Sequence, residues 1–516
     1  MPKLRRVLIA NRGEIAVRVI KACFDEGIES VLAVSEADKG SLGAQLADRV
    51  VVIGPAAAAE SYLDVNRVVA AAKVTGCDGL HPGYGFLSER VELSAECEEA
   101  GIAFVGPSPE AMRRSGDKAT ARALAKELDV PINEGSDVIA SEEAAREIAA
   151  EVGFPVLLKA SAGGGGRGMR LVETEGDLAG AYAAAHGEAQ AAFGDGRLFV
   201  ERYVRQARHV EVQVLGDGRG GAVHLGHRDC TLQRRYQKLV EEAPAHGLSL
   251  ELDEQITGAA VRLIGALDYA GAATCEFLVD PERGTAGFLE INARLQVEHP
   301  VSELVTGVDI VREQLRIAGG EGLSISQQEV EISGHAVEVR INAESPERDF
   351  APTPGTLTVW APPQGSDVRV DSACFPGWSV PPFYDSLLAK LIASGPDREA
   401  ALARTRQALR HLRVEGVETT APFALDLLEH PDVIAGNVHT KWVEEEFMPS
   451  WNEGSAAPNQ VPAARNQGSG PAGGGSGSAA GGTVGGPTPE DALATGRGGG
   501  SPAVTGPAAD PDPEEH

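Results

Sequence analysis

The chain has few cysteines and few basic side chains, and it lacks long apolar runs. Its six cysteines form no C-x-x-C pair or other metal-ligand spacing, which argues against both a cysteine metal site and a disulfide framework. It has 46 basic against 75 acidic side chains, a net charge of −29, which disfavours nucleic acid and anionic membranes as partners. No run of about 18 apolar residues predicts a membrane-spanning helix. We therefore expect a cytoplasmic protein with reduced thiols, no nucleic-acid partner and no membrane partner.

What the chain does have is enough length and apolar content for several hydrophobic cores. Its 516 residues are 42% hydrophobic, which predicts about three domains of roughly 100–200 residues each. From 448 to 516 the composition shifts to glycine, proline and alanine, which cannot bury enough apolar surface to offset the entropy of ordering. We predict that this last segment is a disordered tail.

The first 112 residues alternate short apolar runs with helical stretches. Apolar side chains recur at Ile15, Val19 and Cys23, a spacing that predicts the buried face of a helix. This alternation is typical of a doubly wound parallel sheet, and the fold class is therefore α/β. No G-x-G-x-x-G follows the first strand, so dinucleotide binding is not predicted. The predicted buried strands cover residues 7–10, 31–34, 51–53 and 103–106.

Two later segments also have a clear pattern. Valines alternate with polar residues at 208–216, which predicts a strand with His209 and Glu211 on its polar face. The stretch at 397–412 is rich in alanine, leucine and arginine, which predicts a helix.

A glycine-rich run at 163–168 follows a predicted strand at 155–161. Consecutive glycines let backbone N–H groups approach phosphate oxygens closely, and they allow a loop to swing as a lid. Lys159, near the end of the strand, adds a positive charge suited to phosphate. The run does not match G-x-x-x-x-G-K-[ST], and taken alone it is equally compatible with a plain flexible loop.

Three polar side chains interrupt two otherwise apolar strands. Glu276 lies in the strand at 273–280, and Glu290 and Asn292 share one face of the strand at 287–294. A buried carboxylate without a partner costs several kcal/mol, so each acid requires a cation. Oxygen ligands of this kind suit Mg²⁺ that also contacts ATP phosphates. The alternative is that these carboxylates face solvent or pair with arginine.

The segment after this strand carries candidate catalytic groups. Arg294 has the geometry to bind a small planar oxyanion through two hydrogen bonds, and Glu298 beside it is a candidate general base. Pro300 predicts an extended backbone at His299, which we interpret as structural. Arg340 lies on the polar face of the strand at 334–342, either in a structural ion pair or as an oxyanion stabiliser.

Together, these segments resemble the biotin carboxylase family, the ATP-grasp enzymes of biotin-dependent carboxylases. The resemblance extends from the first strand to about residue 447 and leaves only the tail uncovered. It implies a parallel-sheet domain at 1–112, an ATP-grasp domain at 113–330 with a lid at about 134–204, and a C-terminal biotin carboxylase domain at 331–447. The matching stretches include IANRGEIAVRVI (9–20), HPGYGFLSE (81–89), KASAGGGGRGMR (159–170), RDCTLQRRYQKLVEEAP (228–244), FLEINARLQVEHPVSELVTGVD (288–309) and GHAVEVRINAE (334–344).

The resemblance also implies a role for each matching residue. The catalytic residues are Glu298, which deprotonates bicarbonate, together with Lys238, Arg294 and Arg340. ATP is bound by Lys118, Lys159, Gly165, Gly166, Glu201, Arg202, Tyr203, Val204, His209, Tyr236, Glu276 and Glu290. The metal, Mg²⁺ or Mn²⁺, is held by Glu276, Glu290 and Asn292. Bicarbonate contacts Lys238, Arg294, Gln296 and Val297, and biotin lies beside Tyr84 and Arg340.

The sequence departs from the family pattern in a few places. Tyr236 stands where some members have histidine, which affects nucleotide affinity because a phenol carries no positive charge. Lys21 and Asp25 replace the arginine and glutamate of a dimer contact in some relatives, so a homodimer or larger complex is expected. The chain has no Met-Lys-Met motif, the site of biotin attachment. The implied partners are therefore a biotin carboxyl carrier protein and a carboxyltransferase on separate chains.

The implied reaction is the first half-reaction of an acetyl-CoA or propionyl-CoA carboxylase. ATP and bicarbonate form carboxyphosphate, and the carboxyl group passes to biotin on its carrier. Two alternatives stay open: an ATP-grasp ligase for another carboxylate, and a non-catalytic scaffold protein. The motifs HPGYGF, LQVEHP and GHAVEVRIN argue against the first, and the intact set of candidate catalytic residues argues against the second.

Overall fold

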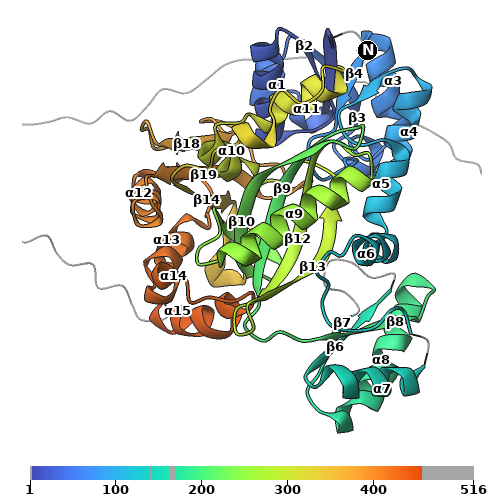
Figure 1. Ribbon diagram of the computed structural model, residues 1–516. Helices are drawn as coiled ribbons and strands as arrows, with labels where there is room; N and C mark the ends of the chain where they lie inside the picture. The colour runs from blue at the N-terminus through green and yellow to red at the C-terminus, as the bar shows by residue number, and fades with distance from the viewer. Residues whose placement is uncertain (1–2, 140, 162–168, 456–516) are drawn as a thin grey trace, which may run out of the picture. The chain divides into compact units, whose positions relative to one another are not determined.

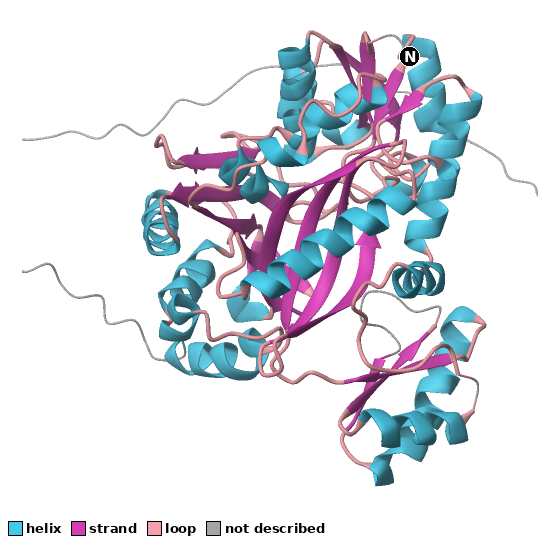
Figure 2. Ribbon diagram, in the orientation of Figure 1, coloured by secondary structure: helices cyan, strands magenta, loops and turns pink. Residues whose placement is uncertain are grey.

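The computed structural model describes residues 3–139, 141–161 and 169–455, all of which belong to one compact unit (Figure 1). Helices and strands alternate through most of this unit, which confirms the α/β fold class (Figure 2). The predicted ATP contacts Gly165 and Gly166 lie outside the described residues. Within the described ranges, no helix is long and apolar enough to cross a membrane.

The N-terminal segment forms a five-stranded parallel sheet in the order β3-β2-β1-β4-β5. Val7, Leu8 and Ile9 are fully buried because helices cover both faces of the sheet, as the doubly wound pattern predicts. The short strand β4 was not predicted from the sequence. The strands are β1 (Arg6–Ile9), β2 (Glu29–Ser35), β3 (Arg49–Gly54), β4 (Gly79–His81) and β5 (Ala103–Phe104).

The first helix of this segment follows directly from its sequence. Its predicted apolar stripe is buried, including Ile15 and Val19, and the helix ends at Gly27. Gly27 has a φ of 68°, a left-handed conformation that glycine adopts without steric cost. The helices in this part of the chain are α1 (Gly13–Glu26), α2 (Leu42–Leu46), α3 (Val65–Thr75), α4 (Val91–Glu99), α5 (Pro109–Gly116) and α6 (Lys118–Glu127).

A separate three-stranded antiparallel sheet, in the order β7-β6-β8, carries Lys159 and Glu201. Two helices pack against it, and together they enclose their own apolar core, which includes Leu158, Leu178 and Val200. The predicted strand at 155–161 is present as β6. The elements are α7 (Glu142–Val152), β6 (Val156–Ala160), β7 (Met169–Val172), α8 (Glu175–Phe193) and β8 (Leu198–Arg202).

The largest sheet has eight strands in the order β13-β12-β9-β10-β11-β14-β19-β18. It continues across residue 330, where the family pattern implies a domain boundary, because β14 pairs with β11. The predicted strands near 208, 273, 287 and 334 are all members. The strands are β9 (Arg208–Asp217), β10 (Ala222–Arg234), β11 (Gln237–Ala243), β12 (Ala270–Asp280), β13 (Thr285–Asn292), β14 (His335–Asn342), β18 (Val368–Ser372) and β19 (Leu387–Gly395).

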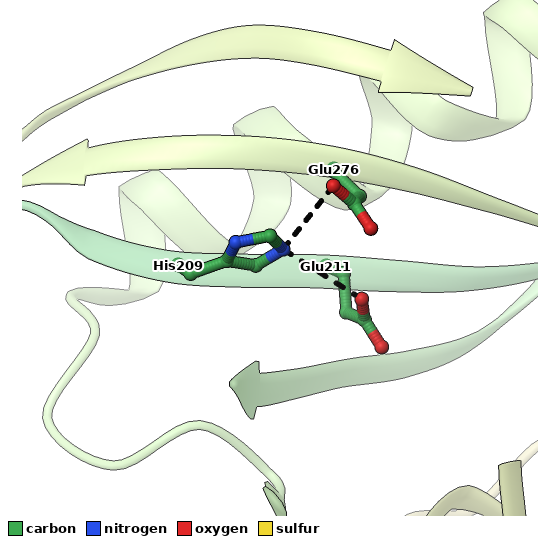
Figure 3. A group of neighbouring side chains, drawn as sticks. All are labelled: His209, Glu211 and Glu276. Atoms are coloured by element: carbon green, nitrogen blue, oxygen red, sulfur yellow. Dashed lines mark ion pairs between the residues drawn. The ribbon is translucent and has the colours of Figure 1, made fainter. Parts of the chain in front are cut away.

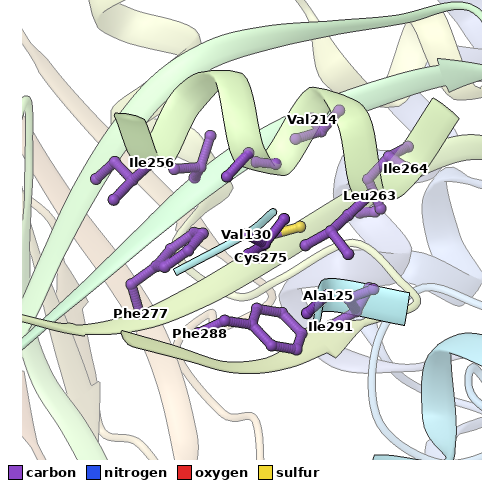
Figure 4. Packing of buried hydrophobic residues seen from close by; sticks show 14 of the residues in the cluster. Ala125, Val130, Val214, Ile256, Leu263, Ile264, Cys275, Phe277, Phe288 and Ile291 are labelled. Carbon is purple, nitrogen blue, oxygen red and sulfur yellow. The ribbon is translucent and has the colours of Figure 1, made fainter. Parts of the chain in front are cut away.

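Helix α9 (Leu250–Ala266) lies along one face of this sheet and closes the core shown in Figure 4. Ile256 and Leu263 on the helix pack with Val214 of β9 and Cys275 of β12. Phe277 and Phe288, from adjacent strands, meet edge to face with ring centroids 6.0 Å apart. The polar side chains of the same strands therefore face away from this core, as strand alternation predicts.

The remaining elements pack around the large sheet and the N-terminal segment. Helix α12 fulfils the prediction of a helix at 397–412 and packs on β14 and β19. The remaining helices are α10 (His299–Thr306), α11 (Ile310–Ala318), α12 (Arg398–His411), α13 (Ala421–Glu429), α14 (Pro431–Ala435) and α15 (Met448–Ser455). The minor strands form the pairs β15 (Glu344–Ser345) with β16 (Ala351–Pro352) and β17 (Val359–Ala361) with β20 (Arg413–Glu415).

Two predictions were wrong. His299 is the first residue of helix α10 rather than an extended residue, because Pro300 occupies the first turn, where its missing N–H costs nothing. The segment predicted to be disordered from 448 begins instead with helix α15. Trp451 of this helix packs edge to face on Phe423 at 5.0 Å, and its indole nitrogen donates to Asp426 at 2.9 Å.

Glu242 on β11 joins two other elements through its carboxylate. It accepts hydrogen bonds from His335 on β14 at 2.7 Å and from Arg398 on α12 at 2.7 Å. Burial alone would raise its pKa, but His335 and Arg398 outweigh burial and lower the pKa of Glu242 to about 2. The ionised carboxylate therefore stabilises the fold above its ordinary pKa, and this stabilisation is lost as the pH falls toward 2.

The variant Glu242→Gln is expected to lower the free energy of unfolding by about 3 kcal/mol at neutral pH. The loss should shrink by half or more near about pH 3, where the native pair contributes less. Urea unfolding of the native chain and of Glu242→Gln, at neutral pH and near about pH 3, measures this difference in the free energy of unfolding. Exposed Glu415, paired with Arg413, is the control, and its Gln variant should cost under about 1 kcal/mol. A loss for Glu242→Gln that does not change with pH would contradict this assignment.

Candidate active site

One row of charged residues crosses four strands of the large sheet. Arg228 on β10 lies opposite Glu211 on β9, Glu211 lies opposite Glu276 on β12, and Glu276 lies opposite Glu290 on β13. Cross-strand partners share one face of a sheet, so these four side chains project on the side away from the apolar core. The pairing register of these strands therefore brings four charged residues that are separate in the sequence together on one surface of the sheet.

Lys238 on β11 lies at the centre of this surface. Its Nζ is 2.6 Å from Glu211, 3.4 Å from Glu276 and 2.5 Å from Glu298. Burial would lower the pKa of Lys238, but these carboxylates and Cys230 outweigh burial and raise it well above its ordinary value. Lys238 is therefore a permanent cation shared by three buried acids.

Glu298, the predicted general base, is held between two cations. Its carboxylate accepts from Lys238 at 2.5 Å and from Arg340 at 2.9 Å, and its side chain is almost fully buried. Burial alone would raise its pKa, but the charges of Lys238, Arg340 and Arg228 hold the pKa well below the ordinary range. Glu298 is therefore ionised at neutral pH, as a base must be before it accepts a proton.

A second pair of carboxyl groups lies beside Arg340. Glu241 accepts from Arg340 at 2.6 Å, and Glu338 lies opposite Glu241 across β11 and β14. Burial raises the pKa of Glu241 to about 7 and that of Glu338 well above its ordinary value. Burial therefore favours the neutral form of both carboxyl groups, while Arg340 makes hydrogen bonds to Glu241 and Glu298.

Arg228 joins the cluster through a buried guanidinium. The sequence left open whether Arg228, with Arg234, Arg235 and Lys238, belongs to a solvated loop or to an anion pocket. The Arg228 guanidinium is fully buried and donates to Glu211 at 2.5 Å. It also makes hydrogen bonds to Gln213, Thr274, Gln296 and Ser302 at 2.7–3.1 Å. Glu211 was likewise not selected, although strand alternation placed it on the polar face with His209. A charged residue on a buried strand was the available signal for both.

The predicted metal ligands are close together. Glu276 accepts from the Asn292 amide at 2.9 Å, and Glu290 is its cross-strand neighbour. Lys118, a predicted phosphate contact, lies 2.9 Å from Glu290. Figure 3 shows His209 pointing between Glu276 and Glu211, at 3.3 and 3.8 Å. Burial would lower the pKa of His209, but Glu276 outweighs burial and raises it.

The residues predicted to bind bicarbonate border the same cluster. Gln296 donates to Glu276 at 3.2 Å, and the carbonyl of Val297 accepts from Lys390. Arg294 donates to Asn292 at 3.1 Å and to Glu89 at 3.1 Å. Glu89 was not selected from the sequence, although it lies in the quoted stretch HPGYGFLSE, because its contact with Arg294 joins segments about 200 residues apart.

The predicted ATP residues of the three-stranded sheet form their own group. Lys159 donates to Glu201 at 2.5 Å, and Arg122 lies 3.4 Å from the same carboxylate. Arg202 pairs with Glu134 at 3.3 Å. No described ion pair joins this group to the Lys238 cluster.

The remaining predicted residues lie at the edges of the site. Tyr203 and Lys441 line a pocket of about 270 Å³, with the ammonium 5.5 Å from the ring centroid. Val204 follows Tyr203 before β9 begins and is half-buried. Tyr236, at the turn between β10 and β11, is 60% exposed. Tyr84 donates its hydroxyl to Glu14 at the start of α1.

Family models match nearly the whole described chain. Residues 3–112 match the biotin carboxylase N-terminal domain, 117–326 match the ATP-binding domain of the carbamoyl-phosphate synthase L chain, and 338–445 match the biotin carboxylase C-terminal domain. The chain belongs to the biotin carboxylase family. This confirms the resemblance based on the motifs, and it makes the chain an ATP-dependent ligase that forms a carbon–nitrogen bond.

Individual members of the biotin carboxylase family agree with this assignment. Biotin carboxylase 1 of Bacillus subtilis is 48% identical over 442 residues, covering 86% of this chain and 98% of that protein. A solved structure described as the biotin carboxylase subunit of pyruvate carboxylase has a TM-score of 0.76 at 44% identity, covering 86% of this chain and 98% of that one.

Another solved family member was crystallised with ligands. The biotin carboxylase domain dimer of Hydrogenobacter thermophilus 2-oxoglutarate carboxylase has a TM-score of 0.80 at 44% identity, covering 86% of this chain and 98% of that one. Its structure is described as a complex with MgADP, ADP and bicarbonate. Those are the ligand classes that the motifs implied for the site described above.

Proposed function

We propose that this chain uses ATP and bicarbonate to carboxylate biotin carried by a separate protein. The observation that carries the proposal is Glu298 held ionised between Lys238 and Arg340, beside the carboxylates Glu276 and Glu290. A base, an anion-binding lysine and a set of oxygen donors for a metal are what activation of bicarbonate by ATP requires.

The proposed role of Glu298 is to remove the proton of bicarbonate. Its lowered pKa keeps it ionised, but the same cations weaken it as a base. A bicarbonate anion bound to Lys238 and Arg294 would share their positive charge and so make the carboxylate more basic. Substrate binding therefore switches on the base, and without substrate its charge is neutralised by ion pairs. The bicarbonate oxygen freed of its proton attacks the γ-phosphorus of ATP, forming carboxyphosphate and releasing ADP.

The donor set fits a divalent metal. Glu276 and Glu290 face each other across two strands, and Asn292 adds an amide, all with oxygen atoms that suit Mg²⁺ or Mn²⁺. Glu276 is buried, with His209 at 3.3 Å and Lys238 at 3.4 Å from its carboxylate, so positive charge is favoured at this position. A bound metal would neutralise charge on the ATP phosphates. We propose Glu276 and Glu290 as its ligands, with Asn292 in support.

The remaining ATP contacts follow the predicted assignment. We propose that Lys118 and Lys159 contact phosphates and that His209 and Tyr236 lie near the ribose and phosphates. Glu201, Arg202, Tyr203 and Val204 would hold the adenine, and the pocket beside Tyr203 supports this placement. Lys159 and Glu201 lie on a sheet with its own core, which supports a separate lid at about 134–204. The other proposed domain limits remain those predicted from the sequence.

Biotin is proposed to bind beside Tyr84 and Arg340. Carboxyphosphate would break down to CO₂ and phosphate, the phosphate would take the N1 proton of biotin, and Arg340 would stabilise the resulting enolate. Biotin N1 then attacks CO₂. Arg340 suits this task because the charges of Glu241, Glu298 and Glu338 outweigh the effect of burial and raise the pKa of its guanidinium, which stays charged.

The partners follow from the reaction. The solved relative described as the biotin carboxylase subunit of pyruvate carboxylase indicates that family members work with other subunits. We propose a biotin carboxyl carrier protein and a carboxyltransferase on separate chains, in a complex of acetyl-CoA or propionyl-CoA carboxylase type. A homodimer is proposed because the solved relative from Hydrogenobacter thermophilus is a dimer. Six buried free cysteines support a reducing, cytoplasmic setting.

The direct test is ATP hydrolysis by the purified full chain. We expect hydrolysis to require bicarbonate and Mg²⁺, to rise several-fold with free biotin, and to be accompanied by fixation of labelled bicarbonate into carboxybiotin. Amino acids in place of biotin serve as control acceptors. Hydrolysis that ignores biotin but rises with an amino acid would replace the proposal with another ATP-grasp ligase.

A further inference from the structure

Lys390 is a charged residue in the middle of an apolar strand. It lies on β19 between Ala389 and Leu391, and its side chain is fully buried. A buried ammonium costs several kcal/mol unless all its donors find partners. The Nζ of Lys390 donates to the carbonyl of Val297 at 2.9 Å and pairs with Glu14 at 3.1 Å and Asp371 at 3.8 Å.

Two of these partners, Val297 and Glu14, contact residues at opposite ends of the proposed active site. Val297 directly precedes Glu298, the proposed base, and is itself a proposed bicarbonate contact. Glu14, in the first turn of α1, accepts the hydroxyl of Tyr84, the proposed biotin contact. The ring centroid of Tyr84 is 6.0 Å from the Lys390 ammonium. A single buried cation thus lies between the bicarbonate end and the biotin end.

Among the described residues, Lys390 provides the hydrogen bond to the backbone of Val297 itself, while the carbonyls of its two neighbours accept from His299 and Val301. Val297 lies in a turn between β13 and α10, outside both the strand ladder and the helix. Lys238 and Arg340 hold the Glu298 side chain, but they bind its carboxylate and not its backbone. The Oε2 atom of Glu14 has no hydrogen-bond partner among the described residues, so Glu14 depends on Lys390 and Tyr84 through its other oxygen.

We propose that Lys390 is a positioning residue that, together with Glu14, holds the Val297–Glu298 turn and Tyr84 at a set separation. The inference rests on the proposed function, because the distance between bicarbonate and biotin matters only if the chain transfers a carboxyl group from one to the other. CO₂ released at the bicarbonate end must reach biotin before it escapes. A shift of about 1 Å between two reacting groups is enough to cost about 100-fold in rate.

The test compares Lys390→Met with the native full chain. Methionine keeps most of the length and buried volume but removes the contacts to Val297, Glu14 and Asp371. We expect the KM for bicarbonate and the KM for biotin each to rise about tenfold, and kcat for biotin carboxylation to fall about tenfold to 100-fold. The KM for ATP should stay within about twofold, because the proposed adenine and phosphate contacts are elsewhere.

Asp371→Asn is the control, because it removes the negative charge of the third partner and leaves Val297 and Glu14 unchanged, although it also weakens the pair of Asp371 with Arg369. Its KM values for bicarbonate and biotin should stay within about twofold of native. If Lys390→Met fails to fold, Glu14→Gln replaces it. That variant keeps the shape and the acceptor for Tyr84 but removes the ion pair, and should raise the same two KM values several-fold.

The outcomes separate this inference from the proposed function. A native chain without biotin-stimulated ATP hydrolysis would overturn the proposed function. The positioning role alone would be overturned if the native chain has that activity but a folded variant keeps its KM values. Here the variant is Lys390→Met or Glu14→Gln, and the KM values are those for bicarbonate and biotin. Equal changes in the Asp371→Asn control would also overturn it, since any loss of charge around Lys390 would then have the same effect.

Discussion

Replacing Glu298 with Gln is expected to lower kcat for bicarbonate-dependent ATP hydrolysis by at least about 100-fold. The amide keeps the size of the side chain and one of the two acceptor oxygens that Lys238 and Arg340 use, but it cannot take a proton from bicarbonate. The KM for ATP should change little, because Glu298 is held by side chains outside the proposed nucleotide contacts. Steady-state ATP hydrolysis at saturating bicarbonate measures the effect.

Glu303 on helix α10, which directly follows Glu298, provides the matched control. It is buried on α10 and paired with Arg18 at 2.8 Å and Arg369 at 2.7 Å, outside the Lys238 cluster. Glu303→Gln should lower the unfolding temperature but leave kcat within about threefold of native. Near-normal turnover in Glu298→Gln would remove Glu298 from the role of base. A loss of the same size in Glu303→Gln would show that the rate depends on the integrity of α10 and not on the carboxylate of Glu298.

Replacing Lys238 with Met is expected to have the largest combined effect on stability and activity. The change leaves Glu211, Glu276 and Glu298 without the cation that they share. Removing one partner of a buried ion pair costs about 3–5 kcal/mol, so unfolding by urea should show a loss of that order. The ratio kcat/KM for bicarbonate should fall by about 100-fold to 1,000-fold, the scale of a lost electrostatic contact to a reacting anion.

The same variant should change the pH dependence. In the native chain the pKa of Glu298 lies well below its ordinary range, so its ionisation does not limit the rate near neutrality. Without Lys238 this pKa rises, and kcat/KM for bicarbonate should fall as the pH is lowered from about 8 to about 6. Lys238→Arg, which keeps the charge, should recover much of the stability. An unchanged pH profile in Lys238→Met would contradict the role of Lys238 in keeping the base ionised.

Local patterns in the sequence predicted most of the strands that carry the site. Alternation of valine with polar residues at 208–216 predicted β9 and its polar face, and the pairing of Glu290 with Asn292 on one face follows from the same periodicity. The missed strand β4 has three residues, which is too short for a periodic signal. Pro300 was misleading because proline both ends strands and begins helices.

The partners of the charged residues were not predictable in the same way. Whether Glu211 meets Lys238 depends on the register of β9, β10 and β11, including irregular pairing between β10 and β11. Contacts such as Arg294 with Glu89, or Lys390 with Glu14, join distant segments through tertiary packing. The sequence did carry a weaker signal, since a charged residue flanked by apolar neighbours on a strand, as at Lys390, requires a buried partner.

The continuity of the large sheet decides which pieces of this protein can be produced alone. A fragment ending near residue 330 would keep β11 but lose β14, its neighbour on the far side. The N–H and C=O groups of β11 that face β14 would then form an open edge, a template for pairing with other chains. Such a fragment is expected to aggregate, and expression trials for this protein should keep 208–395 together as one indivisible block.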